Sequence, residues 1–281
     1  MTSARPAASF FDATTRGTRA AHALRFELGL DIGPIADLWT VIAERGIDLA
    51  FQPFGKAGGD GLYLWNGRRA LIVINSAHGK LPLRQRFTAA HELAHHEMHR
   101  VEGEQLLVAD KTVDPDDVES ATETEREANA FAANLLAPDR ALRQDFASRT
   151  PESIEPLDVI RMTKKYGLSY YSIVNRLLHA GCIRSRDRER LHAARKEPQL
   201  VTQLMKAIQF DPIKAFPPPP SLPESYVEKV ADLTHREVVS TDRAAELLRT
   251  SSKEASRLIA PFSAGREVLP VHDELDQLLD V

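Results

Sequence analysis

One motif constrains this chain more than any other feature: His91-Glu92-Leu93-Ala94-His95, inside a segment with the apolar periodicity of an α-helix. Two residues four positions apart lie on one face of a helix, about 40° apart around its axis, so both imidazoles can reach one metal ion. Glu92 projects close enough to act on a water bound to that ion. The alternative is a helix with two surface histidines and a solvated glutamate, so a third ligand decides between the two interpretations.

The third ligand is expected from a second predicted helix, at about residues 121–137, which carries acids at Glu123, Glu125 and Glu127. At about 100° per residue, Glu125 shares its side of the helix with several apolar residues, whereas Glu123 and Glu127 point to the other side. An unpaired carboxylate on a buried face is costly, and a metal ion removes that cost. We therefore predict Glu125 as the ligand that joins His91 and His95.

Two more side chains are expected beside the ligands without binding the ion. Asn129 lies one turn after the predicted acid and can hydrogen-bond a ligand. His99 lies one turn after His95, but the pattern with a third histidine ligand requires it six residues after His95, where this chain has Val101. We predict that His99 supports the site or ends the helix, and that His96 points away into solvent.

Strand signals are confined to the first third of the chain. Residues 47–54 predict a short strand, and residues 61–65 and 69–75 predict a hairpin with a type I′ turn at Asn66-Gly67. Helical patterns surround these strands, so we predict an α+β fold with a small three-stranded sheet. The hairpin is expected to supply an edge strand to which an extended substrate could add.

The chain is expected to divide into several parts. Helix patterns flanked by Gly167, Ser169 and Gly181 predict a helix-turn-helix-like pair after residue 156, and a run of prolines predicts a stiff linker. The predicted parts are a peptidase domain (1–150), a helix-turn-helix-like segment packed on it (151–195), a helical connection (196–215), a Pro-rich linker (216–223) and a C-terminal helical module (224–281).

The chain resembles the ImmA/IrrE family of metallopeptidases. The resemblance covers about residues 20–185 and rests on Arg86-Phe87-Thr88 before the motif and on Glu125-x-x-Ala128-Asn129-x-Phe131-Ala132-x-x-Leu135-Leu136-x-Pro138 after it. It implies a gluzincin-like, zincin-like core with His91, His95 and Glu125 as zinc ligands and Glu92 as general base. Two departures are Ala137, where the family usually has methionine, and the C-terminal module, which lies outside the common core.

The resemblance also implies a biological setting. Family members are bacterial, phage or mobile-element proteins that cleave or inactivate a repressor encoded nearby. The implied substrate is therefore a helix-turn-helix repressor, and the implied role is transcription regulation or stress response. One catalytic Zn²⁺ is the expected cofactor, although other divalent metals suit the same ligands. The residue that stabilises the oxyanion stays open among Arg86, Tyr166, Tyr170 and Tyr171.

Direct DNA binding is the main alternative function. Residues 157–195 contain nine Lys or Arg residues and three acids, and the stretch Arg184–Arg190 could contact phosphates. The competing interpretation is that these helices brace the peptidase and present a solvated, charged face. A third hypothesis is a sensor that keeps the metal site only to bind a partner, but the intact Glu92 argues against it.

Composition narrows the classes of protein to which this chain could belong. The net charge of −4 gives no global bias toward nucleic acid, and Cys182 is the single cysteine, so no internal disulfide can form. No apolar run approaches the ~20 residues that a membrane-spanning helix needs, and the N-terminal residues lack the apolar core of a signal peptide. These features predict a cytoplasmic protein that does not enter a membrane.

Overall fold

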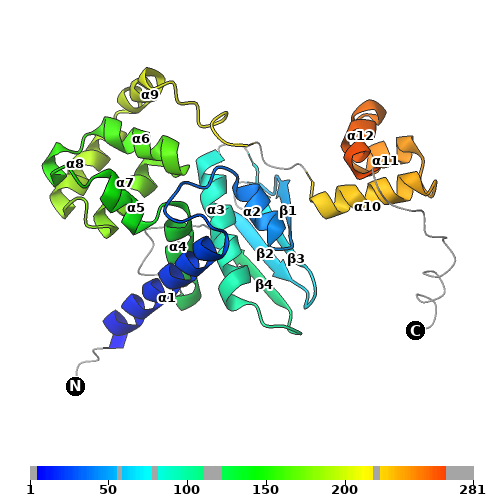
Figure 1. Cartoon of the computed structure of the whole chain (residues 1–281), viewed down its shortest axis with the longest axis horizontal. Helices are drawn as coiled ribbons and strands as arrows, with labels where there is room; N and C mark the ends of the chain where they lie inside the picture. Colours follow the sequence, from blue (N-terminus) through cyan, green and yellow to red (C-terminus); the bar gives the residue numbers. More distant parts are fainter. Residues whose placement is uncertain (1–4, 56–58, 78–81, 111–121, 218–221, 264–281) are drawn as a thin grey trace. The chain divides into compact units, whose positions relative to one another are not determined.

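The computed structural model describes residues 5–55, 59–77, 82–110, 122–217 and 222–263 (Figure 1). The chain divides into two compact units, residues 1–221 and 222–281, which are described separately. The first unit combines helices with a small mixed sheet, so the predicted α+β fold class is confirmed. None of the described helices is long and apolar enough to cross a membrane.

The sheet has four strands rather than the three predicted, in the order β1-β3-β2-β4. β1 pairs parallel with β3, whereas β2 pairs antiparallel with both β3 and β4. The fourth strand falls in the polar stretch after the motif, where no strand was expected. It was missed because its apolar run, residues 106–109, is only four residues long and lies between polar stretches. The strands are β1 (Ile47–Gln52), β2 (Gly61–Trp65), β3 (Ala70–Asn75) and β4 (Leu106–Asp110).

The predicted hairpin exists, but two of its details were wrong. Trp65 pairs with Ala70, so the loop holds four residues instead of the two of a type I′ turn. The Asn66 side chain accepts hydrogen bonds from the backbone N–H groups of Arg68 and Arg69, and only Gly67 in this loop has a positive φ. The hairpin also lies inside the sheet, because β1 and β4 form its edges.

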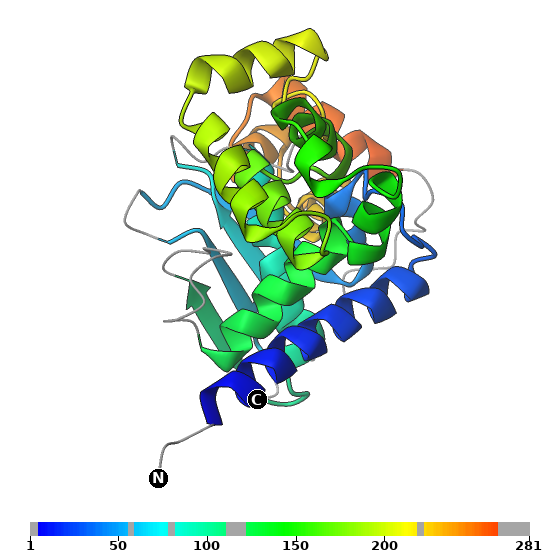
Figure 2. The same ribbon diagram turned by 90° about the vertical axis from the view of Figure 1, so that its left-hand side faces the viewer.

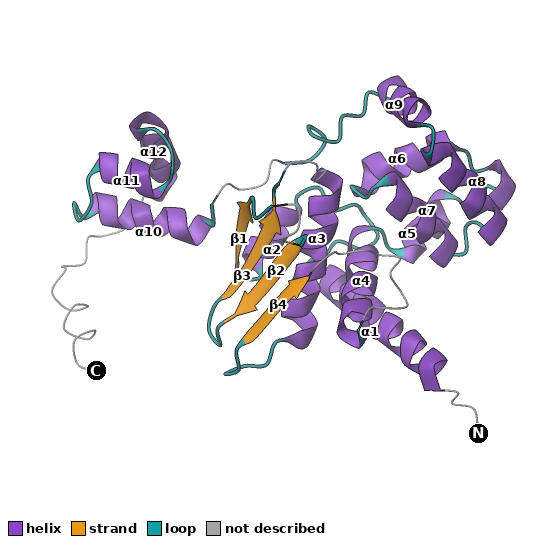
Figure 3. Cartoon of the chain, turned by 180° about the vertical axis from the view of Figure 1, so that it is seen from behind, coloured by secondary structure: helices purple, strands orange, loops and turns teal. Residues whose placement is uncertain are grey.

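The motif helix is enclosed between the sheet and a second helix. α3 (Pro82–Ala94) packs on β2 and β3, and α4 (Glu123–Leu136) packs on the other side of α3 (Figure 3). Beyond Ala94 the helix continues as a π-helical turn, His95–His99. This two-sided packing buries almost every residue of α3 from Arg86 onward, which places the motif in the interior.

A long N-terminal helix covers the far side of α4. α1 (Arg5–Glu27) runs alongside α4 (Figure 2). α2 (Leu38–Glu44) starts at Leu38, because the Asp37 side chain caps it by accepting hydrogen bonds from the N–H groups of Trp39 and Thr40.

The rest of the first unit is helical. The predicted pair is present, with Gly167 in the left-handed conformation after the first helix and the Ser169 hydroxyl capping the second. A short helix directly after Pro138 was not predicted. The elements are α5 (Asp139–Asp145), a 3₁₀ turn (Pro151–Ser153), α6 (Pro156–Tyr166), α7 (Tyr170–His179), α8 (Ser185–Arg195) and α9 (Pro198–Ala207).

The second unit has its own small apolar core. Val230, Ala244, Ala255 and Ile259 are buried together between its helices. Ser251 caps the last helix by accepting a hydrogen bond from the N–H of Glu254. Residues 218–221, half of the predicted Pro-rich linker, lie outside the described residues. The helices are α10 (Glu224–His235), α11 (Thr241–Leu247) and α12 (Ser252–Ile259), followed by a 3₁₀ turn (Ala260–Ser263).

A buried arginine joins α7 to the end of α4. The guanidinium of Arg176 donates to the carbonyl of Ala137, to Asn134 Oδ1 and to Asp139 Oδ1 at distances between 2.6 and 3.2 Å. Because Arg176 is only 7% exposed, Arg176→Met should leave these acceptors without a donor and lower the free energy of unfolding by about 3 kcal/mol. Urea denaturation of the full chain measures this loss; an unchanged midpoint would show that the contacts contribute little.

Candidate metal centre

Three side chains from two helices converge on one point. His91 and His95 come from the motif helix, and Glu125 comes from the first turn of α4; one ligand atom from each lies within 4.8 Å of the others. His91 Nε2 is 3.1 Å from Glu125 Oε2 and 3.3 Å from His95 Nε2. His95 Nε2 is 3.6 Å from Glu125 Oε1. The structure therefore brings together the three residues that the sequence selected.

The site is buried on one side and open on the other. Both imidazoles are at most 1% exposed, whereas the Glu125 side chain is 25% exposed. The Thr122 hydroxyl accepts a hydrogen bond from the N–H of Glu125, which fixes the first turn of α4. A carboxylate in that turn is also favoured by the positive end of the helix dipole.

The outer nitrogens of both imidazoles have partners. His91 Nδ1 is 3.0 Å from Asn129 Oδ1, and His95 Nδ1 is 2.8 Å from His99 Nδ1. These contacts leave the Nε2 atoms to face Glu125. Two imidazole nitrogens and a carboxylate, with the outer ring nitrogens held by neighbours, form the donor set of a catalytic divalent-metal site, so the residues fit a metal ion.

Glu92 is fully buried and lies against the start of β2. A Cβ atom at Gly61 would overlap the Glu92 carboxylate and would lie 2.6 Å from Thr88 Cγ2. The first residue of β2 therefore has to be glycine for the strand to pass this close to Glu92. Sequence reasoning missed Gly61, because a glycine at a strand start is usually interpreted as a strand boundary.

His96 was predicted to be solvated, and this is wrong. It is 2% exposed, and its Nδ1 lies 3.1 Å from the hydroxyl of Tyr63 in β2. Its other ring nitrogen lies 2.6 Å from Arg100 Nη1. Burial, followed by the charges of Arg100 and Arg45, lowers the pKa of His96 to about 4. His96 is thus a neutral packing residue between the motif helix and the sheet.

The prediction that Glu125 is the one acid on a buried face of α4 also needs correction. Glu127 is 7% exposed, because α1 covers the face on which it lies. Its carboxylate bonds to Arg16 of α1 and lies 2.8 Å from His99 Nε2. Glu123, at the helix start, has a half-exposed side chain. The helical periodicity correctly placed Glu125 and Glu127 on different sides of α4. It did not reveal that α3 covers one of these sides and α1 the other.

The four candidates for oxyanion stabilisation are engaged elsewhere. Arg86 is buried, donates to the carbonyl of Ile35 at 2.9 Å, and lies under the ring of Phe216. The Tyr166 hydroxyl donates to Asp145 at 2.6 Å, and burial raises its pKa. The remaining two also have partners: the Tyr170 hydroxyl donates to the carbonyl of Leu191, and the Tyr171 ring packs on His192. These contacts do not support the predicted role.

The basic residues of the helical segment also have partners within the chain. Arg184 and Arg186 both pair with Glu152, Lys165 pairs with Asp145, and Arg176 is buried. These contacts favour helices that brace the peptidase domain over a free phosphate-binding face. The other contacts are Arg161 with Asp158, Lys164 with the carbonyl of Ile208, Arg188 with Asn175, Arg190 with Glu155 and Arg195 with the Tyr171 ring.

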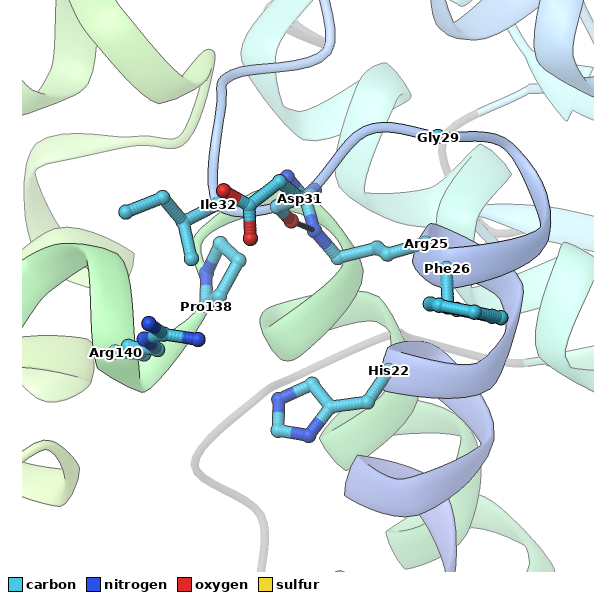
Figure 4. A pocket seen from close by; sticks show the side chains of 8 residues that line it. All are labelled: His22, Arg25, Phe26, Gly29, Asp31, Ile32, Pro138 and Arg140. Atoms are coloured by element: carbon cyan, nitrogen blue, oxygen red, sulfur yellow. Dashed lines mark hydrogen bonds between the residues drawn. The ribbon is translucent and has the colours of Figure 1, made fainter.

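A separate surface hollow of about 520 Å³ lies between the end of α1 and the junction of α4 with α5 (Figure 4). It does not include the three converging side chains. Phe26 is 87% exposed at its rim, while Arg25 donates to the carbonyls of Asp31 and Leu135 and so holds the loop after α1. The other lining residues are His22, Gly29, Asp31, Ile32, Pro138 and Arg140.

Comparison with known proteins agrees with this geometry. No curated protein matches the chain. Residues 42–178 match the model of the IrrE N-terminal-like domain, a peptidase family. The matched region runs from α2 to α7 and contains the motif helix, the sheet and the whole of α4. Residues 42–178 are therefore an IrrE N-terminal-like domain, in agreement with the resemblance to the ImmA/IrrE family.

Proposed function

We propose that the chain is a zinc-dependent endopeptidase that cleaves a regulatory protein. The observation that carries this proposal is the convergence of His91, His95 and Glu125, with the fully buried Glu92 on the same helix as the two histidines. A site made only to hold a structural metal would fill all four positions and would not need that acid. Three protein ligands with a neighbouring carboxylate are the donor set of hydrolytic zinc enzymes.

The chain's own residues would divide the work as follows. When bound, Zn²⁺ would supply Lewis-acid polarisation of the scissile carbonyl and lower the pKa of a water. Glu92 would accept a proton from the attacking water at its carboxylate and then deliver it to the leaving nitrogen. Asn129 and His99 would hold the His91 and His95 rings in orientation through their outer nitrogens.

The edge of the sheet offers a place for an extended substrate. β4 pairs with β2 on one side, and its other side is an edge of the sheet. Backbone groups on such an edge can bind a peptide as an added strand. We assign this role to β4 instead of the hairpin, because both hairpin strands lie inside the sheet.

The metal site is tested by measuring bound metal in Glu125→Ala beside the wild type. The wild-type protein should hold about one zinc per chain, and Glu125→Ala should lose most of it because only two ligands remain. Glu152→Ala, which removes a surface acid of similar type, serves as the control. Equal zinc in all three proteins would contradict the assignment of Glu125 as a ligand. If the wild type holds a different metal, that metal takes the place of zinc in the proposal.

The substrate is proposed from the family resemblance as a helix-turn-helix repressor encoded near the gene. Incubating the zinc-loaded protein with purified regulators from the adjacent genes should give discrete fragments of one of them. Mass spectrometry of the fragments identifies the cleaved bond. If each neighbouring regulator stays intact while an unrelated protein is cut at one site, the repressor assignment is wrong but the peptidase assignment holds.

A further inference from the structure

A chain of polar contacts runs outward from His95 to the N-terminal helix. His95 Nδ1 lies 2.8 Å from His99 Nδ1, and His99 Nε2 lies 2.8 Å from Glu127 Oε2. The other oxygen of Glu127 bonds to Nε of Arg16 in α1. Four side chains from three elements, beginning with the proposed metal ligand His95, are therefore linked by successive polar contacts.

The two ends of this line determine where its protons lie. His95 can bind a metal only through an unprotonated Nε2, so its Nδ1 carries the hydrogen and donates to His99 Nδ1. His99 must then carry its own hydrogen on Nε2, which donates to the Glu127 carboxylate. Arg16 can only donate, and the carboxylate can only accept. The tautomers of His95 and His99 thus follow from the metal at one end and the accepting carboxylate of Glu127 at the other.

The line is shielded from solvent along most of its length. The side chains of His99 and Glu127 are 11% and 10% exposed, whereas that of Arg16 is 37% exposed. A carboxylate hydrogen-bonded to a histidine holds that histidine's orientation, and the hydrogen bond is stronger away from water. The peptidase mechanism proposed above does not use Glu127, so its burial calls for another reason.

α1 is built to approach Glu127 closely. A Cβ atom at Gly17 would overlap the carbonyl oxygen of Glu127 and lie 3.0 Å from the Cβ of Ala130. Glycine at this position therefore lets α1 cross α4 without a gap, and Arg16, its neighbour, reaches the carboxylate. Arg16 also bonds to Glu123 and Asp12, which hold its guanidinium in place. α1 lies outside the region matched by the family model.

We propose that Glu127, held by Arg16, is a positioning residue for the metal ligand His95, and that α1 is therefore a working part of the metal centre. Glu127 acts through His99: it fixes the tautomer and orientation of the His95 ring. This inference rests on the proposed metal site. It assigns a role in metal affinity to a helix that the peptidase family model does not include.

The test measures metal affinity in the full-length protein by competition with a chromophoric zinc chelator. Glu127→Gln keeps the shape of the side chain but removes the charge, and should weaken zinc binding about 10- to 100-fold. Arg16→Gln should weaken it less, and Arg16→Lys should restore most of the loss. The Co²⁺-loaded protein gives a second readout: the visible absorption bands should shift in Glu127→Gln, because the His95 ring changes orientation.

The matched control is Asp158→Asn. Asp158 is also 10% exposed and also pairs with an arginine, Arg149, but its contacts lie in the α6 cap. This variant should lose stability without losing zinc affinity or shifting the Co²⁺ bands. Wild-type zinc affinity and Co²⁺ bands in Glu127→Gln would overturn the inference while leaving the metal site standing. Failure of the wild type to bind metal would instead overturn the proposed function.

Discussion

Glu92→Gln is expected to stop peptide cleavage while metal binding stays intact. The carboxylate is fully buried on the motif helix, between the two histidines, and an amide cannot accept the proton that the attacking water must lose. The loss of a general base costs about 10²- to 10⁴-fold in rate, so kcat/KM on the identified substrate should fall by at least about 100-fold. Fragment yield over time measures the rate, and metal analysis checks the site.

Glu97→Gln is the control for this substitution. Glu97 belongs to the same helical segment, pairs with Arg45 at 2.8 Å, and is not one of the three converging residues. It should keep wild-type cleavage within a few-fold. Cleavage by Glu92→Gln at the rate of Glu97→Gln would show that another group accepts the proton, and the proposed mechanism would then be wrong.

Gly61→Ala is expected to have the next largest effect, through a single added methyl group. The new Cβ would overlap the Glu92 carboxylate and would lie 2.6 Å from Thr88 Cγ2. Either β2 or the Glu92 side chain must shift, and a displacement of about 1 Å at a reacting group costs about 100-fold in rate. We expect kcat to fall by this factor while zinc stays bound, because Gly61 is not one of the proposed metal ligands.

Gly33→Ala separates this effect from the general cost of replacing a glycine. A Cβ at Gly33 would meet only the carbonyl oxygen of Leu30, at 3.4 Å, and its φ is not in the left-handed region. Cleavage by this variant should match the wild type. If Gly61→Ala is as active as Gly33→Ala, then the close approach of β2 does not hold Glu92 in place.

The convergence of His91, His95 and Glu125 could be predicted because it depends on helical periodicity. The spacing within each helix determines which side chains share a face, and the apolar residues show which face is buried. The same logic paired β2 with β3, because two β-prone runs separated by a short loop form a hairpin. The face shared within each helix and the hairpin depend on neighbours along the chain, whereas the meeting of the two helices depends on the packing of α3 against α4.

Other features depend on segments that are distant in sequence. Glu127 is buried because α1 packs over it, and His96 is buried because Tyr63 lies beside it. β4 forms by pairing with β2 from more than 40 residues away, and Leu107 in that strand stays 64% exposed. Gly61 is needed for a contact across two elements, which no local pattern records. A single sequence holds no direct signal for such contacts.

The register of β4 has a consequence for specificity. Asp110 pairs with Gly61, the residue that touches Glu92, and Leu107 lies three positions further along β4. At about 3.3 Å per residue, this places Leu107 about 10 Å from the reacting end of the strand. If a substrate adds to this edge, the register of β4 sets the distance between Leu107 and the cleaved bond. The exposed Leu107 side chain would then sense one substrate residue at a fixed distance from the cleaved bond, so changing Leu107 should alter which sequences are cut.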